Sequence, residues 1–139
     1  MAWRFEHSAE SSATKADIWR RYVDVAHWCE WSRLGVEWSR LEGPFEVGTK
    51  GKSKPPGLPA GTFRLVGVEP ERMFATKTRL PGGRVHFEHV IEPLGAGAWI
   101  THRARIEGPL GFLYERILRR SILRALPDGV DHLASTTPG

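Results

Sequence analysis

Residues 87 to 106, FEHVIEPLGAGAWITHRARI, constrain the fold more than any other segment of the sequence. Apolar and polar residues alternate on both sides of Gly95-Ala96, which is the pattern of two strands joined by a two-residue hairpin turn. That turn places His89 opposite His102. Because directly opposed residues of an antiparallel pair share a face, both imidazole rings are predicted to lie on the same side of a sheet.

The same alternation divides the neighbouring strands into an inner, mainly apolar face and an outer, charged face. Two-residue turns at Pro81-Gly82 and Pro70-Glu71 extend the pairing backwards along the chain. The inner face is then predicted to hold Phe63, Leu65, Phe74, Thr76, Thr78, Val85, Phe87, His89, Ile91, Ile100, His102, Ala104 and Ile106. The outer face is expected to meet water and holds Arg64, Lys77, Arg79, His86, Glu88, Glu92, Thr101, Arg103, Arg105 and Glu107, with Trp99 as an apolar outlier.

The predicted elements follow the order strand, two short helices, about six strands and a long C-terminal helix. The first helix begins after Thr14, whose spacing to Asp17 is that of a capping box, and it breaks near Asp24. The second helix runs from Ala26 to Glu30. This order predicts an α+β fold in which the helices cover one side of an antiparallel sheet.

The long helix is predicted to begin after Gly108-Pro109 and to end or kink at Pro127. The side expected to cover the sheet holds Leu110, Tyr114, Ile117, Leu118, Ser121 and Ala125. The other side holds Glu115, Arg116, Arg119, Arg120 and Arg124, and a solvated face explains these arginines more simply than an interaction surface does. Residues 134–139 are expected to fray, and residues 1–139 are expected to form one domain.

Composition excludes several classes of protein. The formal net charge is +4 without a run of Lys and Arg, so we expect no nucleic-acid binding. The single cysteine, Cys29, excludes an internal disulfide and a cysteine-rich metal site, and its aromatic neighbours favour a buried position. No segment has the apolar length of a signal peptide or a membrane span, so we expect a cytoplasmic protein that does not insert into membranes.

Five segments carry a resemblance to a known superfamily: WRFEHSAE, ADIWRRYVDVAHWCEW, GPFEVGTKGKSKPPG, FRLVGVEPERMF and ITHRARIEGPLGFLYERILRR. In order and spacing the chain resembles the START, birch-pollen-allergen and polyketide-cyclase-like superfamily (SRPBCC). The resemblance implies a helix-grip fold, in which a seven-stranded antiparallel sheet wraps around the long C-terminal helix and encloses a hydrophobic cavity. It also implies that Trp28, Trp31 and Trp38 lie near the cavity mouth or under the short helices.

The resemblance implies a fold but no single activity, because the superfamily includes lipid carriers, hormone receptors, aromatases and cyclases, ring-hydroxylase subunits and chaperone activators. The motifs G-x-S-x-G and H-E-x-x-H and the P-loop are all absent from the sequence. GTKGKSK lacks phosphate-loop spacing and is predicted to be a strand with its turn. KPPGLPAG, which starts at Lys54, is interpreted as a loop beside the cavity or as a rigid connection.

The candidate ligand-binding residues are the inward residues of the sheet together with three residues of the long helix: Phe63, Leu65, Phe74, Thr76, Thr78, Phe87, His89, Ile91, Ile100, His102, Tyr114, Ile117 and Ser121. His89 and His102 are also the candidate catalytic residues, since imidazole titrates near neutral pH. The facing of His7 on the first strand stays open. The inner face holds no carboxylate, and two histidines are poor evidence for zinc, so we expect neither a metal nor another cofactor.

Three functions stay open at this stage. The preferred hypothesis is binding or transport of a hydrophobic, lipid- or polyketide-like molecule in an internal cavity. The alternative is a polyketide cyclase or aromatase-like enzyme in which His89 or His102 acts as general acid/base. A protein-interaction module that uses the arginine face is the third. The sequence leaves a homodimer open, and the histidine pair can also be a simple polar lining of an apolar interior.

Overall fold

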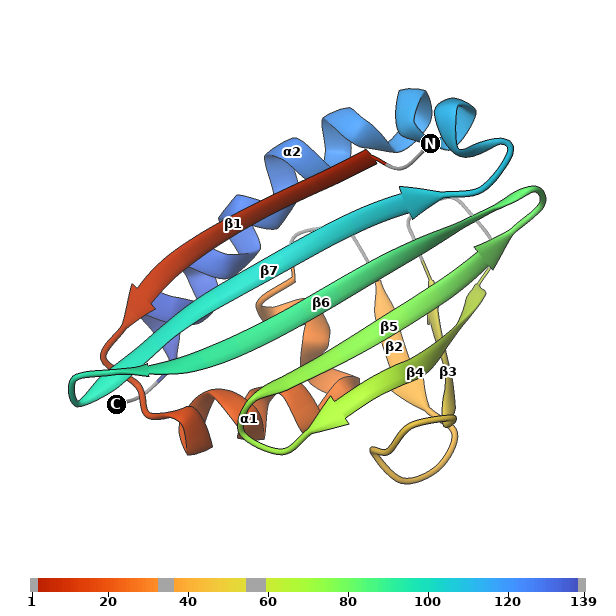
Figure 1. Ribbon diagram of the computed structural model, residues 1–139. Helices are drawn as coiled ribbons and strands as arrows, with labels where there is room; N and C mark the ends of the chain where they lie inside the picture. The colour runs from red at the N-terminus through yellow and green to blue at the C-terminus, as the bar shows by residue number, and fades with distance from the viewer. Residues whose placement is uncertain (1–2, 33–36, 55–59, 138–139) are drawn as a thin grey trace.

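The computed structural model describes residues 3–32, 37–54 and 60–137. In chain order the elements are β1 (Trp3–Ser11), α1 (Lys15–Val23), η1 (Val25–Glu30), β2 (Trp38–Leu41), β3 (Lys50–Lys54), β4 (Gly61–Glu69), β5 (Met73–Leu80), β6 (Gly83–Leu94), β7 (Gly97–Glu107) and α2 (Gly111–Thr136). Within the described residues, seven antiparallel strands form one sheet in the order β1-β7-β6-β5-β4-β3-β2 (Figure 1). The predicted α+β helix-grip fold is confirmed. Most of KPPGLPAG lies outside the described residues.

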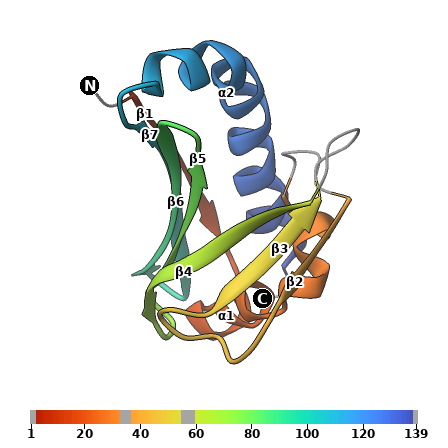
Figure 2. The ribbon, with the colours of Figure 1, turned by 90° about the vertical axis from the view of Figure 1, so that its right-hand side faces the viewer.

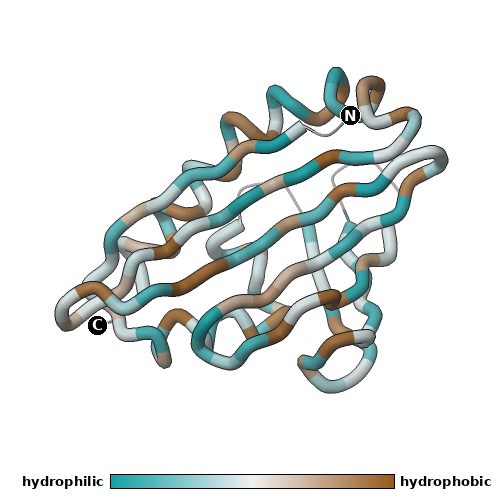
Figure 3. Tube along the Cα trace, viewed as in Figure 1, coloured by the Kyte–Doolittle hydropathy of each residue, from teal (hydrophilic) through white to brown (hydrophobic). Residues whose placement is uncertain are grey.

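The sheet bends strongly, and the helices lie on one side of it (Figure 2). α2 packs mainly on β1 and β7, whereas α1 packs on β6 and η1 packs on β2. Apolar and polar residues alternate along β6 and β7, as Figure 3 shows. The inner face is therefore covered by two separate elements, the long helix on one half and the short helices on the other.

The predicted register of the central hairpin is confirmed, since His89 pairs with His102. The turn predicted at Pro70-Glu71 is wrong in detail. Glu69 pairs with Met73, so the loop has one residue more than predicted, and Glu71 adopts a φ of 62° within it. A register shift between Leu65 and Gly67 compensates for the extra residue. The bulge therefore restores the predicted facing of the strand beyond it.

α1 starts as predicted and fixes one residue of the interior. The Thr14 side chain accepts a hydrogen bond from the Asp17 amide, and the Asp17 carboxylate accepts one from the Thr14 amide. These bonds satisfy backbone donors that the first helical turn leaves free. The capped helix buries Ile18 and Tyr22 completely. Tyr22 thereby reaches the inner face of the sheet.

Of the two outcomes predicted at Pro127, an end or a kink of the long helix, the end is wrong. α2 continues through Pro127 to Thr136, because a proline inside a helix removes one backbone hydrogen bond and the packing around it can offset that loss. Apart from Gly111, its buried residues begin at Ile122: Ile122, Ala125, Leu126, Gly129, Val130, Leu133 and Ala134. Ala134 to Thr136, which were expected to fray, are part of the helix. Ser11 donates a hydrogen bond to the Ala134 carbonyl at 2.7 Å, and Thr137 is buried.

The first half of α2 covers the sheet only in part. Tyr114 and Leu118 of the predicted stripe are half-buried and pack against the core, whereas Ile117 is 62% exposed and Ser121 is also exposed. The start of the helix is held where Leu110 donates to the Gly82 carbonyl at 2.8 Å and Tyr114 donates to the Pro81 carbonyl at 2.5 Å. Its arginines are exposed, as the solvated-face interpretation requires.

Cys29 was predicted to be buried, and it is exposed. It lies in η1, whose short 3₁₀ segment buries only Val25. The neighbouring Trp28 takes the inward position instead and packs on Phe63 and Phe74. Aromatic neighbours in the sequence were therefore a poor guide, because the Cys29 thiol is exposed and not buried.

Candidate functional site

The two opposed histidines meet on the inner face, as predicted. The ring centroids of His89 and His102 are 4.5 Å apart, and the ring planes make an angle of 73°. Nε2 of His102 shares a hydrogen bond of 2.8 Å with the Tyr22 hydroxyl, which α1 carries to this point. Because antiparallel pairing fixes His89 and His102 and the capped helix fixes Tyr22, the three side chains form a preset polar group.

Aromatic rings enclose this polar group. The His89 ring stacks on Phe74, with centroids 4.0 Å apart and an angle of 2° between the planes. Trp31, which follows η1 and is buried, lies 5.9 Å from His89 and 5.6 Å from His102 between ring centroids. The histidines therefore sit in an apolar cage rather than among charged groups.

His7 lies on the same face, which settles the point that the sequence left open. It pairs with His102 across β1 and β7, so His7, His102 and His89 form a row across three strands. His7 is separated from the cage by its own partner, the Asp131 carboxylate of α2, at 3.0 Å. Among the described residues no group of three or more His, Cys, Asp or Glu side chains has the arrangement of a metal site.

A small cavity of about 30 Å³ adjoins the histidine pair. The sheet side is formed by Phe87, His89 and His102, and the other sides by Trp31, Ser32, Ala125, Leu126 and Gly129. Nε1 of Trp31 and Nδ1 of His89 are buried, and neither atom has a hydrogen-bond partner within the described part of the chain. The volume matches the space that one water-sized polar group needs.

Burial decides the charge of the site. It lowers the pKa of His89 to about 3, although a hydrogen bond to the Phe74 backbone acts in the opposite direction. Burial lowers the pKa of His102 well below its usual range, with smaller contributions from His89 and His7. Burial also raises the pKa of Tyr22. All three groups are therefore uncharged at neutral pH, because a low-dielectric surrounding disfavours every charged form. The site can share hydrogen bonds, but it holds no formal charge.

The structure brings only part of the predicted site together. His89, His102 and Phe87 line the cavity, and Phe74 supports His89. Five further inward residues, Phe63, Leu65, Thr76, Ile91 and Ile100, are buried in the surrounding core. Thr78 and Tyr114 are half-buried near the start of α2, and Ile117 and Ser121 are exposed.

Sequence reasoning missed Tyr22, Trp31 and the α2 residues of the cavity. Tyr22 was placed on the apolar side of the first helix, but nothing in the sequence linked it to His102. Trp31 was expected near the cavity mouth or under the short helices, but not as a neighbour of the histidines. Leu126 was inside the predicted helix but outside its predicted apolar stripe, and Gly129 lies beyond Pro127, where the helix was predicted to end or kink. One signal was available, namely that the small residues Ala125 and Gly129 are four apart and therefore share a helix face.

The chain was compared with solved structures. The aromatase/cyclase Zhui from Streptomyces sp. R1128 superimposes with a TM-score of 0.78 at 12% identity, over 96% of this chain and 92% of that chain. Norcoclaurine synthase from Thalictrum flavum has a TM-score of 0.71 at 17% identity, over 96% and 85%. The di-domain protein StfQ from the steffimycin biosynthetic pathway has a TM-score of 0.72 at 15% identity, over 96% of this chain and 50% of that chain.

These identities are low, so the likenesses support the fold alone. No curated protein matches the sequence at a significant level. Among the described residues, no helix combines the length and the apolar character that a bilayer crossing requires. Residues 2–137, however, match the family described as polyketide cyclase / dehydrase and lipid transport. Since the match covers nearly the whole sequence, the chain belongs to this family within the SRPBCC superfamily.

Proposed function

We propose that the protein binds an apolar small molecule that carries one hydroxyl or carbonyl oxygen, and that this oxygen lies in the cavity beside Trp31 and His89. The observation that carries the proposal is the pair of buried nitrogen atoms without hydrogen-bond partners, Nε1 of Trp31 and Nδ1 of His89. A buried polar atom that lacks a partner costs about 1–3 kcal/mol. An oxygen between the two atoms would recover that cost.

The surroundings of the cavity favour an apolar ligand body. Phe87, Ala125 and Leu126 line it, and the aromatic cage encloses its histidines. A mainly apolar hollow with a few convergent polar groups is the usual form of a small-molecule site. Because the cavity itself measures only about 30 Å³, it receives the oxygen end and not the whole molecule.

We place the apolar body under the first half of α2. Phe112 is 61% exposed, Ile117 is 62% exposed, and Leu113 is also exposed, so this half carries apolar area that the core does not use. In this arrangement Thr78, Phe87, Tyr114, Ile117 and Ser121 would contact the ligand. The bonds of Leu110 and Tyr114 to the β5–β6 turn hold the start of the helix, and the segment between Ile117 and Ser121 would move to admit the ligand.

Charge is what favours binding over catalysis. A general acid/base works best when its pKa lies near the working pH, and burial lowers the pKa of His89 to about 3. A neutral imidazole with so low a pKa is a weak base and donates no charge to a transition state. It remains a good hydrogen-bond partner for a neutral oxygen.

The experiment uses 1-naphthol as the oxygen-bearing probe and naphthalene as the matched probe without oxygen. We expect 1-naphthol to raise the melting temperature more than naphthalene does. Ala125→Leu should remove this effect because its side chain fills the cavity, whereas Ser135→Leu, at an exposed position of the same helix, should not. His89→Phe should make the two probes bind alike. Equal effects of both probes on the unsubstituted protein would refute the anchoring role.

The second candidate is a cyclase or aromatase-like enzyme, and one observation favours it. The Tyr22 hydroxyl is hydrogen-bonded to His102, whose ring lies against that of His89, and such a hydrogen-bonded pair can move a proton if a substrate reaches it. The family description, polyketide cyclase / dehydrase and lipid transport, gives the substrate class to try, a polyketide such as a poly-β-ketone. Turnover that survives both His89→Ala and His102→Ala would end this candidate. Mass spectrometry of small molecules that co-purify with the protein would identify the natural ligand in either case.

A further inference from the structure

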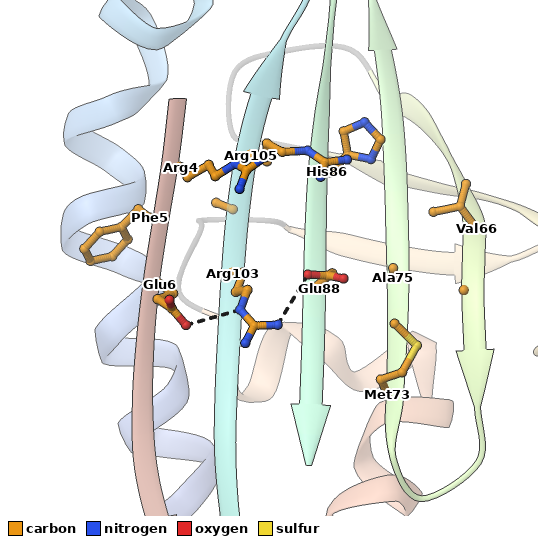
Figure 4. Close-up of a pocket in the computed structure, with 12 residues that line it drawn as sticks. Arg4, Phe5, Glu6, Val66, Met73, Ala75, His86, Glu88, Arg103 and Arg105 are labelled. Atoms are coloured by element: carbon orange, nitrogen blue, oxygen red, sulfur yellow. Dashed lines mark hydrogen bonds and ion pairs between the residues drawn. The ribbon is translucent and has the colours of Figure 1, made fainter. Parts of the chain in front are cut away.

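The outer face of the sheet is not the plain water-facing surface that the sequence predicts. It contains an open hollow of about 520 Å³ over β1, β7, β6, β5 and β4, far larger than the inner cavity. We call it the outer hollow. Its lining residues include Arg4, Glu6, Val66, Gly67, Met73, Ala75, His86, Glu88, Arg103 and Arg105, most of which Figure 4 shows.

Basic residues form a continuous row that lines the outer hollow with Arg4, Arg105 and His86 and continues beyond it across β5, β4 and β3. The strand register pairs each member with the next, from β1 to β3: Arg4, Arg105, His86, Lys77, Arg64 and Lys50. We call this set the basic row. Burial and the charge of Arg105 lower the pKa of His86, so this member of the row is uncharged at neutral pH. The directly opposed like charges therefore include Arg4 with Arg105, and Lys77 with Arg64, and such pairs are destabilising unless an anion compensates for them.

The carboxylates of the protein compensate for the basic row only in part. A single oxygen of Glu107 serves Arg105 at 3.1 Å, His86 at 3.2 Å and Arg84 at 3.4 Å. Nε of Arg105 and Nε2 of His86 are buried, and within the described ranges neither forms a hydrogen bond of good geometry. Nε of Arg105 and Nε2 of His86 therefore both depend on one Glu107 oxygen, which is already shared with Arg84.

Other members of the basic row have no carboxylate at all. Among the described residues, Arg4, Lys77 and Arg64 form no ion pair. Glu6 and Glu88, the acids that line the hollow, both point at Arg103, with distances of 3.2 and 3.6 Å (Figure 4). The hollow therefore has one row in which two carboxylates share a single arginine and, beside it, the basic row with excess positive charge.

The β4–β5 side of the outer hollow is apolar and shallow. Gly67 and Ala75 are cross-strand partners with very small side chains. The larger side chains of Met73 and Val66 line the hollow beside them. Ala75 lies two residues along β5 from Lys77, which is about 7 Å at the rise of a strand. An apolar group of about six carbons would cover Ala75 and Gly67 while its head group stays within reach of the basic row.

We propose that the outer hollow binds a small amphiphile with an anionic oxygen head group, a phosphate monoester or a carboxylate, on Arg4, Arg105 and Lys77, and with a short apolar body on Gly67, Ala75 and Met73. Arginine side chains suit such head groups because the guanidinium fork bonds two oxygens at once. The site lies on the face of the sheet opposite the histidine cage. It is thus independent of the function proposed above.

The test uses hexyl phosphate, inorganic phosphate and hexanol as probes, with calorimetry for affinity and the ring resonances of His86 in NMR spectra for location. Hexyl phosphate should bind most tightly and shift His86. The double variant Arg4→Gln, Lys77→Gln should weaken its binding about tenfold or more. The double variant Arg116→Gln, Arg120→Gln removes the same charge from α2 and should change the affinity less than about twofold.

Ala75→Leu tests the apolar half of the site, because its side chain would occupy the hollow. It should reduce the affinity for hexyl phosphate to that for inorganic phosphate, while Ala26→Leu at an exposed position of η1 should leave it unchanged. The proposal fails if hexyl phosphate binds no better than phosphate, or if the α2 variant loses as much affinity. It also fails if the protein binds vesicles of phosphatidic acid but not hexyl phosphate, since the row then recognises a membrane surface.

Discussion

The inner and outer faces of β5, β6 and β7 share the same backbone, and alternate residues of each strand serve opposite purposes. The inner residues Phe74, His89 and His102 pack against aromatic rings and leave a cavity of only about 30 Å³. The outer residues Ala75 and Arg105 border a hollow of about 520 Å³ whose charges are unevenly distributed. The inner face excludes charge by burial, and the outer face gathers it.

The difference shows where each kind of ligand chemistry belongs. On the inner face, desolvation keeps two histidines and a tyrosine neutral, and the ligand proposed for that face is accordingly bound by shape and by neutral hydrogen bonds. On the outer face, arginines share one carboxylate, and the ligand proposed for that face is accordingly an anion. A single sheet can in this way present two chemically separate sites within the thickness of one backbone.

The largest expected contrast is between two adjacent residues. Phe74→Ala should lower the free energy of unfolding by about 3–5 kcal/mol, because Phe74 is fully buried and supports His89, Tyr22 and Trp28. Met73→Ala, on the outer face, should cost less than about 1.5 kcal/mol. Urea denaturation measures both. Similar costs would mean that the two faces do not differ in packing.

Acid should destabilise the inner face. The pKa of His89 in the folded protein, about 3, lies below the ordinary value of 6.5, so below pH 6.5 the unfolded chain binds a proton that the folded chain does not. The free energy of unfolding should therefore fall as pH decreases, by about 1.4 kcal/mol per pH unit for this group. The depressed pKa of His102 acts in the same direction.

The matched comparison uses two histidine substitutions. His89→Gln should make the loss of stability between pH 6.5 and about pH 4 less steep. His27→Gln should not, because His27 is exposed and its hydrogen bond to Asp24 raises its pKa instead. Chemical denaturation at a series of pH values gives the slopes. The same slope for the unsubstituted protein and for His89→Gln would show that His89 is not held neutral.

The two tyrosines allow a smaller, matched test. Tyr22→Phe leaves Nε2 of His102 without its partner in a buried site and should cost about 1–3 kcal/mol. Tyr114→Phe removes a bond from a half-buried hydroxyl to the Pro81 carbonyl and should cost less than about 1 kcal/mol. Thermal unfolding of both variants decides the point. A larger loss for Tyr114→Phe would place the critical hydrogen bond at the start of α2.

The smallest effect is expected for Arg103 and the two carboxylates that it pairs with on the outer face. Arg103 is exposed and pairs with Glu6 and Glu88 at 3.2 and 3.6 Å. Exposed ion pairs contribute about 0–1 kcal/mol, so Arg103→Gln should change the free energy of unfolding by less than about 1 kcal/mol. Adding 1 M salt should remove most of that difference. A loss above 2 kcal/mol would show that the outer face also contributes to the core.

The sequence predicted the strands well because alternation and turn residues act locally. A hairpin turn fixes which residues oppose each other, and His89 and His102 were therefore placed correctly. The facing of β4 was also predicted correctly, but two errors cancelled. The β4–β5 loop is one residue longer than predicted, and a bulge beyond Leu65 restores the register. A bulge leaves no clear local signal, so this agreement could not have been guaranteed.

Contacts between distant segments were beyond local patterns. The stripe that contains Ile117 and Ser121 predicts an apolar helix face, but only tertiary packing decides which part of the helix meets the sheet. Pro127 was predicted to end or kink the helix. The buried residues on both sides of it keep the helix continuous. The contact of Tyr22 with His102 joins residues 80 positions apart, and nothing local specifies it.

The outer hollow was missed for a related reason. Alternation assigned Ala75, His86 and Arg105 to a charged face, which is correct, but a facing pattern contains no information about depth. The depth arises because Gly67 and Ala75, two small residues, become neighbours across β4 and β5. Only the register of all the strands reveals that the basic residues form one row.

The central claim is that the inner histidines form a neutral anchor for a ligand oxygen. The most direct measurement is the ¹⁵N NMR titration of the His89 ring, with and without 1-naphthol. The account predicts that the ring stays neutral from pH 7 down to about pH 4, and that Nδ1 shifts when 1-naphthol binds but not when naphthalene does. A His89 ring that titrates near pH 6.5, or a nitrogen that responds equally to both compounds, would contradict it.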